Sequence, residues 1–346
     1  MEYVLPQSIK SIIKGTSASV VDSPVIAREP SSPSHSLNTV VGFLVGLLCS
    51  VAVIILRELF DVTIRTEEDV QRVCPHPILA AVPDMNVQPK GGYYYDRDRK
   101  KKPSSDKETV LIGPGISFAA AESYKLLRTK LQFSFADEQA CHVIGVSSAV
   151  AGEGKSLSSV NLAYALAQLE KKVLLVDCDM RRPSLNQKLS IQKIPGLSNF
   201  LTRQVEWSGI VQHYGTEGCT FDVVSAGRNP PNPIELLSSA AMKTILEQQR
   251  ESYDYIILDL PPVGEVSDAL VTAKLVDGML MVVRQNYCSS PALSAAISQF
   301  AFVETRILGV VINCAGEGSG HYSKVYKGYQ SRYGSSSRSS HKEKKT

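Results

Sequence analysis

The sequence predicts an α/β fold with a doubly wound, mostly parallel sheet, helices on both of its faces, and one transmembrane helix before it. Three observations support this prediction. Short apolar runs rich in Val and Ile alternate with helical segments from about residue 115 onward. One of these runs leads into a glycine-rich loop that ends in Gly-Lys-Ser and opens a helix. An uncharged apolar segment precedes them all and is long enough to cross a bilayer.

The composition is that of a globular protein without a strong charge bias. The chain has 346 residues, 43% hydrophobic and 21% charged, and a formal net charge of +3. That charge is too small to predict nucleic-acid binding. The 7 cysteines form no C-x-x-C pair and no Cys/His cluster with zinc spacing. We therefore expect no disulfide framework and no structural metal site, and we expect a reducing compartment.

The membrane helix is predicted over residues 39–60. Thr39–Leu56 reads TVVGFLVGLLCSVAVIIL and carries no charge. As a helix this stretch spans roughly 27 Å, which is close to the thickness of the hydrocarbon core of a bilayer. A buried core helix is the alternative interpretation.

Basic residues on either side of this span predict its orientation. Residues 19–38 contain Arg28 alone among Lys and Arg, whereas three arginines follow the span: Arg57, Arg65 and Arg72. The positive-inside rule then places the C-terminal part in the cytoplasm, anchored to the cell membrane. Residues 1–38 become a short extracytoplasmic stub.

Residues 61–114 are predicted to form a cytoplasmic juxtamembrane region and linker. The region ends in GGYYYDRDRKKKPSSDKE, which has the composition of a solvated connection. Its basic cluster, Arg97, Arg99 and Lys100–Lys102, either contacts anionic lipid headgroups or stays solvated.

Residues 115–320 form the main predicted domain. We expect its strands near residues 142–147, 173–177, 221–225, 255–260, 279–283 and 307–313. Continuous apolar strands separated by helices are typical of a parallel sheet that is buried on both faces. Open α/β sheets bind ligands at the carboxyl ends of their strands, so polar residues there are functional candidates.

A phosphate-binding loop follows the strand at 142–147. Ala149–Ser156 reads AVAGEGKS, a Walker A pattern with Ala in place of the first Gly. Its glycines let the backbone approach a polyphosphate, and the start of the helix adds free N–H groups. Lys155 supplies a charge for the β- and γ-phosphates, and the Ser156 hydroxyl suits Mg²⁺. The expected phosphate-binding residues are Ala151, Gly152, Glu153, Gly154, Lys155, Ser156 and Leu157.

Three aspartates lie at the ends of two apolar strands. Asp177 and Asp179 belong to VLLVDCD, and Asp259 ends DYIILD. Two carboxylates 4 Å apart repel by roughly 4 kcal/mol at an effective dielectric of 20. A bound Mg²⁺ or a hydrogen-bonding substrate would relieve this repulsion; a helix N-cap at Asp179 is the alternative. Behind a Walker A loop, Asp259 has the form of a Walker B carboxylate, which holds Mg²⁺.

With these elements the chain resembles the bacterial tyrosine kinases of capsular and extracellular polysaccharide export, which are related to the partition-protein ATPases. Their pattern is a Walker A loop, an hhhhDxD element called Walker A′, a Walker B strand and a tyrosine-rich tail. All four occur in that order over roughly residues 115–333. The segments LRELFDVTIRTEEDV and PILAAVP also resemble the C-terminal end of the polysaccharide co-polymerase, or chain-length regulator. A natural fusion and a truncated reading frame both fit this arrangement.

The resemblance implies a P-loop NTPase fold and a protein-tyrosine kinase that uses ATP and Mg²⁺. Lys155 would hold phosphates, while Ser156 and Asp259 would organise Mg²⁺ with support from Asp179. Asp177 is the candidate for accepting the proton of the tyrosine hydroxyl, although spacing does not decide which aspartate is the base. Asp268 would cap or position, and the proline-rich GRNPPNPIELLSS would shape the site.

The helix at 120–133 carries Glu122, Lys125 and Arg128 three residues apart, which places them on one face. The family's E-x-x-R-x-x-R element joins subunits into a ring, so the resemblance implies a homo-oligomer formed through this helix. Lys125 replaces an Arg, which weakens bidentate pairing with a carboxylate but keeps a charge pair. An ordinary solvated face is the alternative.

Residues 321–346 are predicted to be a disordered tail. Its tyrosines, Tyr322, Tyr326, Tyr329 and Tyr333, lie in a polar and basic setting. They are the expected phosphoacceptors in trans, and their phosphorylation is expected to disrupt the ring. Tyr93–Tyr95 are further candidate acceptors. An RNA-stacking tail and a merely solubilising end are the alternatives.

The resemblance also implies a role in polysaccharide polymerisation and export. The implied partners are the co-polymerase or export machinery, a tyrosine phosphatase, the membrane and further copies of the chain, and no nucleic acid. A membrane-bound partition- or positioning-type ATPase switch is one alternative, but such proteins carry an extra Lys early in Walker A, where this chain has Val150. A non-catalytic chain-length scaffold is another, and the three aspartates argue against it.

Overall fold

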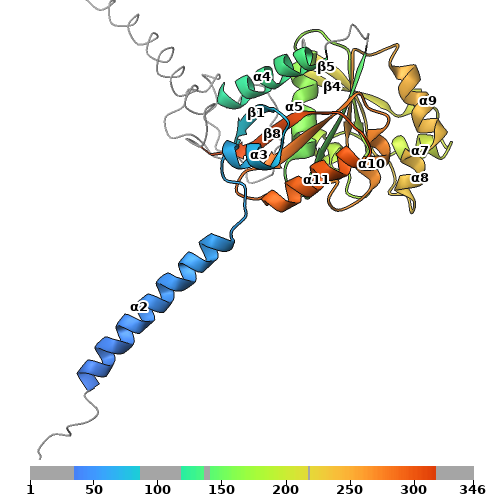
Figure 1. The fold of residues 1–346 in the computed structure, drawn as a ribbon. Helices are drawn as coiled ribbons and strands as arrows, with labels where there is room; N and C mark the ends of the chain where they lie inside the picture. The colour runs from blue at the N-terminus through green and yellow to red at the C-terminus, as the bar shows by residue number, and fades with distance from the viewer. Residues whose placement is uncertain (1–34, 86–117, 136–140, 217–218, 317–346) are drawn as a thin grey trace, which may run out of the picture. The chain divides into compact units, whose positions relative to one another are not determined.

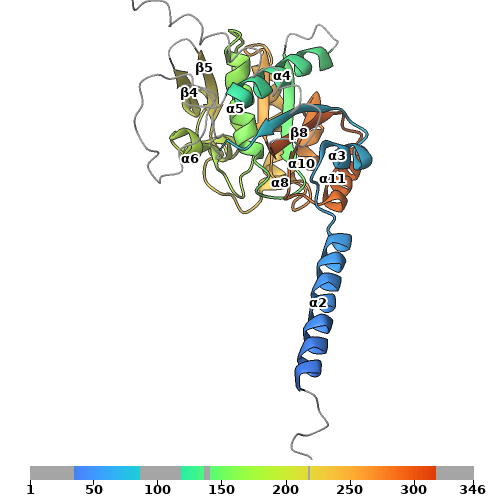
Figure 2. The ribbon, with the colours of Figure 1, turned by 90° about the vertical axis from the view of Figure 1, so that its left-hand side faces the viewer.

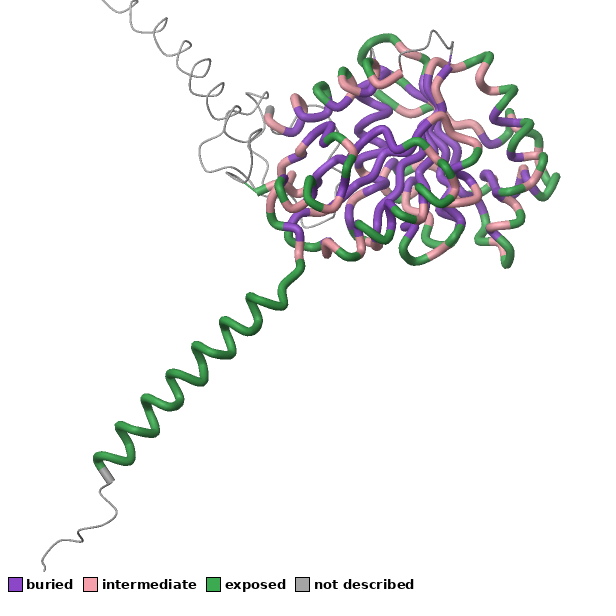
Figure 3. The backbone as a smooth tube through the Cα atoms, viewed as in Figure 1, coloured by how far each residue is buried: buried purple, intermediate pink, exposed green. Residues whose placement is uncertain are grey.

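The computed structural model describes residues 35–85, 118–135, 141–216 and 219–316. They divide into two compact units, one up to Asp61 and one from Val62 onward. The first unit contains a single described helix, α2 (His35–Phe60) (Figure 1). Ser36–Phe60 has a mean hydropathy of 2.8 and is long and apolar enough to cross a membrane. Its side chains are exposed from Ser36 to Phe60, as a lipid-facing helix requires (Figure 3).

The second unit is built on one 8-stranded sheet in the order β1-β8-β7-β2-β6-β3-β5-β4. All neighbouring strands are parallel except β4 and β5. This confirms the predicted mostly parallel sheet. The strands are β1 (Ile78–Pro83), β2 (His142–Ser148), β3 (Val173–Asp177), β4 (Val211–Thr216), β5 (Cys219–Val224), β6 (Tyr255–Asp259), β7 (Gly278–Arg284) and β8 (Ile307–Ala315).

Helices cover both faces of the sheet (Figures 1 and 2). One face carries α4 (Phe118–Ser134), α5 (Lys155–Ala167) and α6 (Leu185–Leu189). The other carries α3 (Glu67–Val73), α7 (Leu197–Leu201), α8 (Pro233–Leu237), α9 (Ala240–Gln249), α10 (Asp268–Ala273) and α11 (Ser290–Phe302). A 3₁₀ turn, η1 (Trp207–Gly209), precedes β4.

Two separate hydrophobic cores follow from the period of two along each strand. In β3, Val173 and Leu175 face the core shared with α4 and α5, whereas Leu174 and Val176 face the opposite core. Because both faces are buried, the central strands read as unbroken apolar runs. This is why the sequence located them closely.

Two strands escape the sequence prediction for different reasons. β1 lies between prolines inside the region predicted to be a linker, yet it pairs in parallel with β8, and most of it is buried. The compact unit that contains β1 begins at Val62. β4, with the sequence VQHYGT, pairs with β5 alone at the edge of the sheet. An edge strand needs no continuous apolar run, so its polar sequence carries no strand signal.

Candidate active site

The predicted P-loop joins β2 to α5 at the carboxyl edge of the sheet. Gly152 and Gly154 have φ values of 85° and 94°, in the left-handed region that favours glycine. A Cβ atom on Gly154 would lie 2.0 Å from Nδ2 of Asn313. Backbone conformation and space therefore both require glycine here. Gly154 is also the N-cap of α5, so this bare stretch of backbone leads directly into a helix N-terminus, where N–H groups are free to bind phosphate.

Glu153 holds the loop through its side chain. The residue is fully buried, and its carboxylate accepts the N–H of Val150 at 2.8 Å and that of Arg284 at 3.3 Å. Burial raises the pKa of Glu153, and the backbone N–H groups of Val150 and Arg284 oppose this shift. The carboxylate thus shapes the loop, and the backbone of Glu153 is the part that can meet a nucleotide.

Asn313 fastens the same loop from the end of β8. Its Nδ2 donates to the backbone oxygen of Glu153 at 2.8 Å, and its Oδ1 accepts the N–H of Cys314. No sequence motif predicts a role for Asn313. The available signal is a polar side chain ending the apolar run VIN at the carboxyl edge, where open α/β sheets place their ligands.

Lys155 lies among the predicted acidic residues. Its Nζ is 2.8 Å from Oδ2 of Asp179 and 3.8 Å from Oδ1 of Asp259. It also lies 3.4 Å from the Ser156 hydroxyl. Burial acts to lower the pKa of Lys155, but the charges of Asp259 and Asp179 outweigh it and raise that pKa. The ammonium group therefore stays charged and neutralises part of the acidic cluster.

Asp177 and Asp259 are direct neighbours in the register of β3 and β6. Asp177 is fully buried, and its two oxygens accept the N–H groups of Asp179 at 3.1 Å and Leu185 at 3.2 Å. Burial and then the charge of Asp259 raise the pKa of Asp177 well above its ordinary value, against the influence of Lys155. The sheet register thus confines two carboxylates of the predicted triad to adjacent strand ends.

Asp259 has one carboxylate oxygen to spare. Its Oδ1 accepts the Ser159 hydroxyl at 3.4 Å, whereas its Oδ2 is buried without a hydrogen-bond partner among the described residues. Burial raises the pKa of Asp259, and Lys155 opposes this shift. A buried carboxylate oxygen with no donor fits a cation site, because a cation supplies what a donor does not.

No group of three His, Cys, Asp or Glu side chains could hold a metal ion by itself in the described part of the chain. Beside a nucleotide, Mg²⁺ takes one or two protein ligands and completes its shell with phosphate oxygens and water. Ser156, Asp179 and Asp259 therefore fit Mg²⁺ delivered together with a nucleotide.

The loop after Asp179 is tied to α10 by an ion pair. Nε and Nη2 of Arg181 lie 2.9 and 3.0 Å from the two oxygens of Asp268, which is fully buried. Asn229, in the predicted proline-rich shaping loop, donates to the backbone oxygen of Arg181 at 3.1 Å. The sequence predicts a capping or positioning role for Asp268 but no partner, because nothing local relates it to Arg181.

The outer half of the P-loop has three further contacts that no sequence motif predicts. The N–H of Ala151 donates to Glu265 at 2.7 Å, and the Tyr287 hydroxyl donates to the Ala151 oxygen at 3.0 Å. Nη1 of Arg284 donates to the Gly152 oxygen at 3.3 Å. Glu265 and Tyr287 come from the loops that follow β6 and β7, Arg284 is the last residue of β7, and their sequence shows no motif.

The predicted oligomerisation face on α4 has partners within the chain. Nζ of Lys125 lies 2.6 Å from Glu122, and Arg128 donates to the backbone oxygen of Ala165 on α5 at 2.8 Å. Arg128 is thus turned toward its own domain, although the assignment of this face to subunit contact stays a prediction. The candidate phosphoacceptors, Tyr322, Tyr326, Tyr329, Tyr333 and Tyr93–Tyr95, lie outside the described residues.

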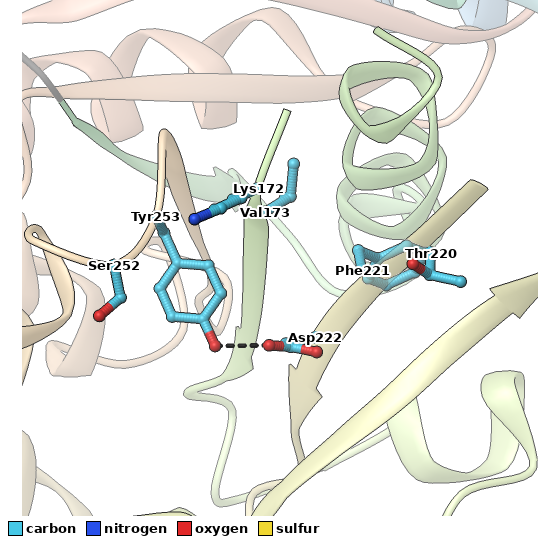
Figure 4. Close-up of a pocket in the computed structure, with 7 residues that line it drawn as sticks. All are labelled: Lys172, Val173, Thr220, Phe221, Asp222, Ser252 and Tyr253. Carbon is cyan, nitrogen blue, oxygen red and sulfur yellow. Dashed lines mark hydrogen bonds between the residues drawn. The ribbon is translucent and has the colours of Figure 1, made fainter. Parts of the chain in front are cut away.

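A separate polar pocket lies away from the P-loop, beside the start of β3 (Figure 4). Within it the Tyr253 hydroxyl donates to Asp222 at 2.6 Å. It is lined by Lys172, Val173, Thr220, Phe221, Asp222, Ser252 and Tyr253. Tyr253 and Lys172 precede β6 and β3, whose carboxyl ends carry Asp259 and Asp177, so this pocket belongs to the opposite edge.

The fold and the site together define a P-loop NTPase of the ParA type. Residues 139–344 match the ParA family, described as a NUBPL iron-transfer P-loop NTPase. The chain is 29% identical over 294 residues to a putative tyrosine-protein kinase in the cps region of Klebsiella pneumoniae, covering 85% of this chain. It is 32% identical over 215 residues to the tyrosine-protein kinase YwqD of Bacillus subtilis, covering 62% of this chain and 90% of that one.

The solved kinase domain of Escherichia coli tyrosine kinase ETK is similar with 29% identity and a TM-score of 0.60, over 69% of this chain and 90% of that one. The chain belongs to the ParA family of P-loop NTPases and, within it, to the bacterial tyrosine-protein kinases. This confirms the predicted resemblance. The chain spans 40% of the length of the long relatives, including the Klebsiella protein.

Proposed function

We propose that this chain is an ATP-dependent protein-tyrosine kinase that phosphorylates the tyrosines of its own C-terminal tail in trans. The observation that carries the proposal is the position of Lys155. Its ammonium group lies between Asp179 and Asp259, where the P-loop meets the ends of β3 and β6. Phosphoryl transfer depends mainly on positioning and charge stabilisation, which such an arrangement supplies.

The nucleotide would be held by the backbone N–H groups of Gly152–Leu157 and by Lys155. Mg²⁺, held by Ser156 and Asp259 with support from Asp179, would neutralise charge on the phosphates. The spare buried oxygen of Asp259 supports this assignment. In the described structure the positive charge of Lys155 offsets the negative charges of the carboxylates. When Lys155 turns toward a phosphate group, a Mg²⁺ ion at the same cluster would offset those charges in its place.

Asp177 is the proposed proton acceptor for the tyrosine hydroxyl. Its raised pKa makes its carboxylate a stronger base than an ordinary aspartate. Its contacts with the N–H groups of Asp179 and Leu185 hold the carboxylate in one orientation. Each oxygen keeps a second lone pair for a hydroxyl proton.

The juxtamembrane residues from Val62 onward belong to the same compact unit as the P-loop. We include this juxtamembrane segment in the proposal as a regulator in cis. The N–H of Ile64 donates to the backbone oxygen of Cys288 at 2.8 Å, and the backbone oxygen of Ile64 accepts the N–H of Asn286 at 2.9 Å. This strand-like contact holds the loop that carries Tyr287 and directly follows Arg284, and both of these side chains contact the P-loop. A change in the segment next to α2 would therefore reach the nucleotide site through that loop.

The proposed setting is the cytoplasmic side of the cell membrane. The apolar helix α2 supports an anchor, and the cps-region relative supports a role in capsular or exopolysaccharide polymerisation and export. The proposed partners are a polysaccharide co-polymerase or the export machinery, a tyrosine phosphatase, and further copies of the chain in a ring through residues 120–133.

The test uses the full chain in detergent micelles with MgATP, with phosphotyrosine mapped by mass spectrometry. We expect phosphate on Tyr322–Tyr333 in the wild type and none after Lys155→Met or Asp177→Asn. Lys172→Met is the matched control, because this exposed lysine lies at the other end of β3. The further variant Asp179→Asn distinguishes the proposed supporting role of Asp179 at the metal from the role of Asp177 as the base.

Two outcomes would replace the proposal. ATP hydrolysis without phosphotyrosine would identify a membrane-bound ATPase switch. Nucleotide binding without either activity would identify a non-catalytic scaffold of chain-length control.

A further inference from the structure

Tyr287 differs from the other tyrosines that the structure describes. Its side chain is 51% exposed, whereas the remaining described tyrosines are buried or partly buried. Its hydroxyl donates to the Ala151 oxygen at 3.0 Å, and a Cβ atom on Gly152 would lie 3.0 Å from that hydroxyl. An accessible phenol therefore lies at the rim of the P-loop.

The surroundings of Tyr287 combine a cation with a fixed backbone. The guanidinium carbon of Arg284 lies 5.3 Å from the centre of the Tyr287 ring, while Nη1 donates to the Gly152 oxygen. The flanking residues Asn286 and Cys288 are both bonded to Ile64. The ring can thus turn outward about its side-chain bonds while the loop stays in place.

We propose that Tyr287 is a second phosphoacceptor, modified by another copy of this chain, and that phosphate on it weakens ATP binding. This inference rests on the proposed kinase function. The Tyr287 side chain contacts Ala151 and Arg284 and not the aspartate cluster of its own chain. The active site that donates the phosphoryl group therefore belongs to a second copy.

The transfer balances with MgATP as the donor. The phenol oxygen of Tyr287 forms a bond to the γ-phosphorus as the bond from that phosphorus to the β,γ-bridging oxygen breaks. ADP leaves with this electron pair, and the phenol proton passes to the proposed base, Asp177 of the second copy. The acceptor hydroxyl gives up one hydrogen bond to Ala151 on entering that site.

Phosphate on Tyr287 would oppose ATP in two ways. It adds nearly two negative charges at the rim of a loop that receives an anionic polyphosphate. Arg284 is the adjacent cation and would pair with the new phosphate, because guanidinium and phosphate form bidentate hydrogen bonds. Gly152 and Ala151 would then both lose a donor that supports the loop.

The first experiment maps phosphotyrosine on the wild-type full chain in detergent micelles after incubation with MgATP. We expect phosphate on Tyr287 as well as on the tail. Tyr253 is the internal control and should stay unmodified, because it is less exposed and its hydroxyl donates to Asp222 at 2.6 Å at the opposite edge of the sheet (Figure 4). A phosphorylated tail with unmodified Tyr287 overturns this inference alone, whereas absence of all phosphotyrosine overturns the proposed function with it.

The second experiment measures the dissociation constant for ATP of the phosphorylated and the phosphatase-treated chain. The same pair is measured for Tyr287→Phe, which keeps the aromatic ring beside Arg284. Phosphorylation should weaken ATP binding by the wild type by roughly tenfold, as expected for like charges at close range. The change should be absent in Tyr287→Phe. An equal change in both proteins would place the effect in the tail and overturn the assignment to Tyr287.

Discussion

Arg181 and Asp268 form a two-pronged ion pair, 2.9 and 3.0 Å long, between the loop that follows Asp179 and the first residue of α10. The Asp268 side chain has no exposed surface, whereas that of Arg181 is 40% exposed. The pair therefore positions the loop from a buried anchor. It places Asp268 behind the candidate site and outside direct chemistry.

Asp268→Asn should slow phosphotyrosine formation more than it raises the KM for ATP, because Asp179 depends on the anchored loop, whereas the backbone of the P-loop is held by Glu153 and Asn313. We also expect the free energy of unfolding to fall by about 1–3 kcal/mol, the usual cost of losing hydrogen bonds to a charged group. Steady-state kinetics and urea unfolding measure the two effects.

The matched control is Asp277→Asn, which breaks the comparable pair between Asp277 and Arg250 at the amino edge of the sheet. It should cost similar stability and leave kcat nearly unchanged. Equal losses of kcat in the two variants would show that Asp268 has a purely structural role.

Gly154→Ala should disable the P-loop for two separable reasons. A left-handed backbone costs a residue with a side chain about 1–2 kcal/mol, and the new Cβ would also meet Nδ2 of Asn313. In an Asn313→Ala background the second cost disappears and the first remains. A double-mutant cycle of unfolding free energies should therefore show coupling between the two positions. The same cost of Gly154→Ala in both backgrounds would contradict the steric argument.

Stability at alkaline pH should depend on Tyr124 in α4. Burial raises the pKa of Tyr124 to about 12, and the residue is fully buried. In an unfolded chain the pKa of tyrosine is about 10, so the folded chain holds this proton more tightly. The contribution is fully present below pH of about 10 and is lost as the pH rises through about 12, with a limiting slope of about 1.4 kcal/mol per pH unit.

Tyr124→Phe removes this titrating group, so its unfolding free energy should fall less steeply than that of the wild type between pH of about 10 and 12. Urea unfolding at a series of pH values gives both slopes. Parallel curves would mean that Tyr124 ionises as easily in the folded chain as in the unfolded one.

Ile64→Ala should weaken the link between the juxtamembrane segment and the nucleotide site. Ile64 is fully buried, and shortening a buried isoleucine costs about 2–5 kcal/mol. We expect the KM for ATP to rise and phosphotyrosine formation to slow, because the loop bonded to Ile64 carries Tyr287 and directly follows Arg284. Leu59→Ala is the control, since this side chain of α2 is 73% exposed. If the juxtamembrane segment is released from this loop in Ile64→Ala and neither the KM for ATP nor phosphotyrosine formation changes, regulation in cis is refuted.

Several parts of the site were predictable because they are local. The P-loop is a run of adjacent residues, in which the glycines carry the positive φ values and Lys155 follows directly. Asp177 and Asp259 each end an apolar strand, and parallel strands bring their carboxyl ends to one edge of the sheet. The order of strand, loop and helix therefore placed these residues near each other before any distance was known.

The class of fold, the apolar helix α2 and the residues of the phosphate loop were thus predictable from local patterns, because each depends on neighbouring residues or on a short repeat. The pairing of Arg181 with Asp268, 87 residues away, and the support of Glu153 by Asn313, 160 residues away, arise only in the folded chain. Folding also makes β1 a strand, since its pairing with β8 turns an ambiguous apolar stretch into an edge of the sheet. Such contacts follow from the order of the strands, which no local pattern of residues encodes.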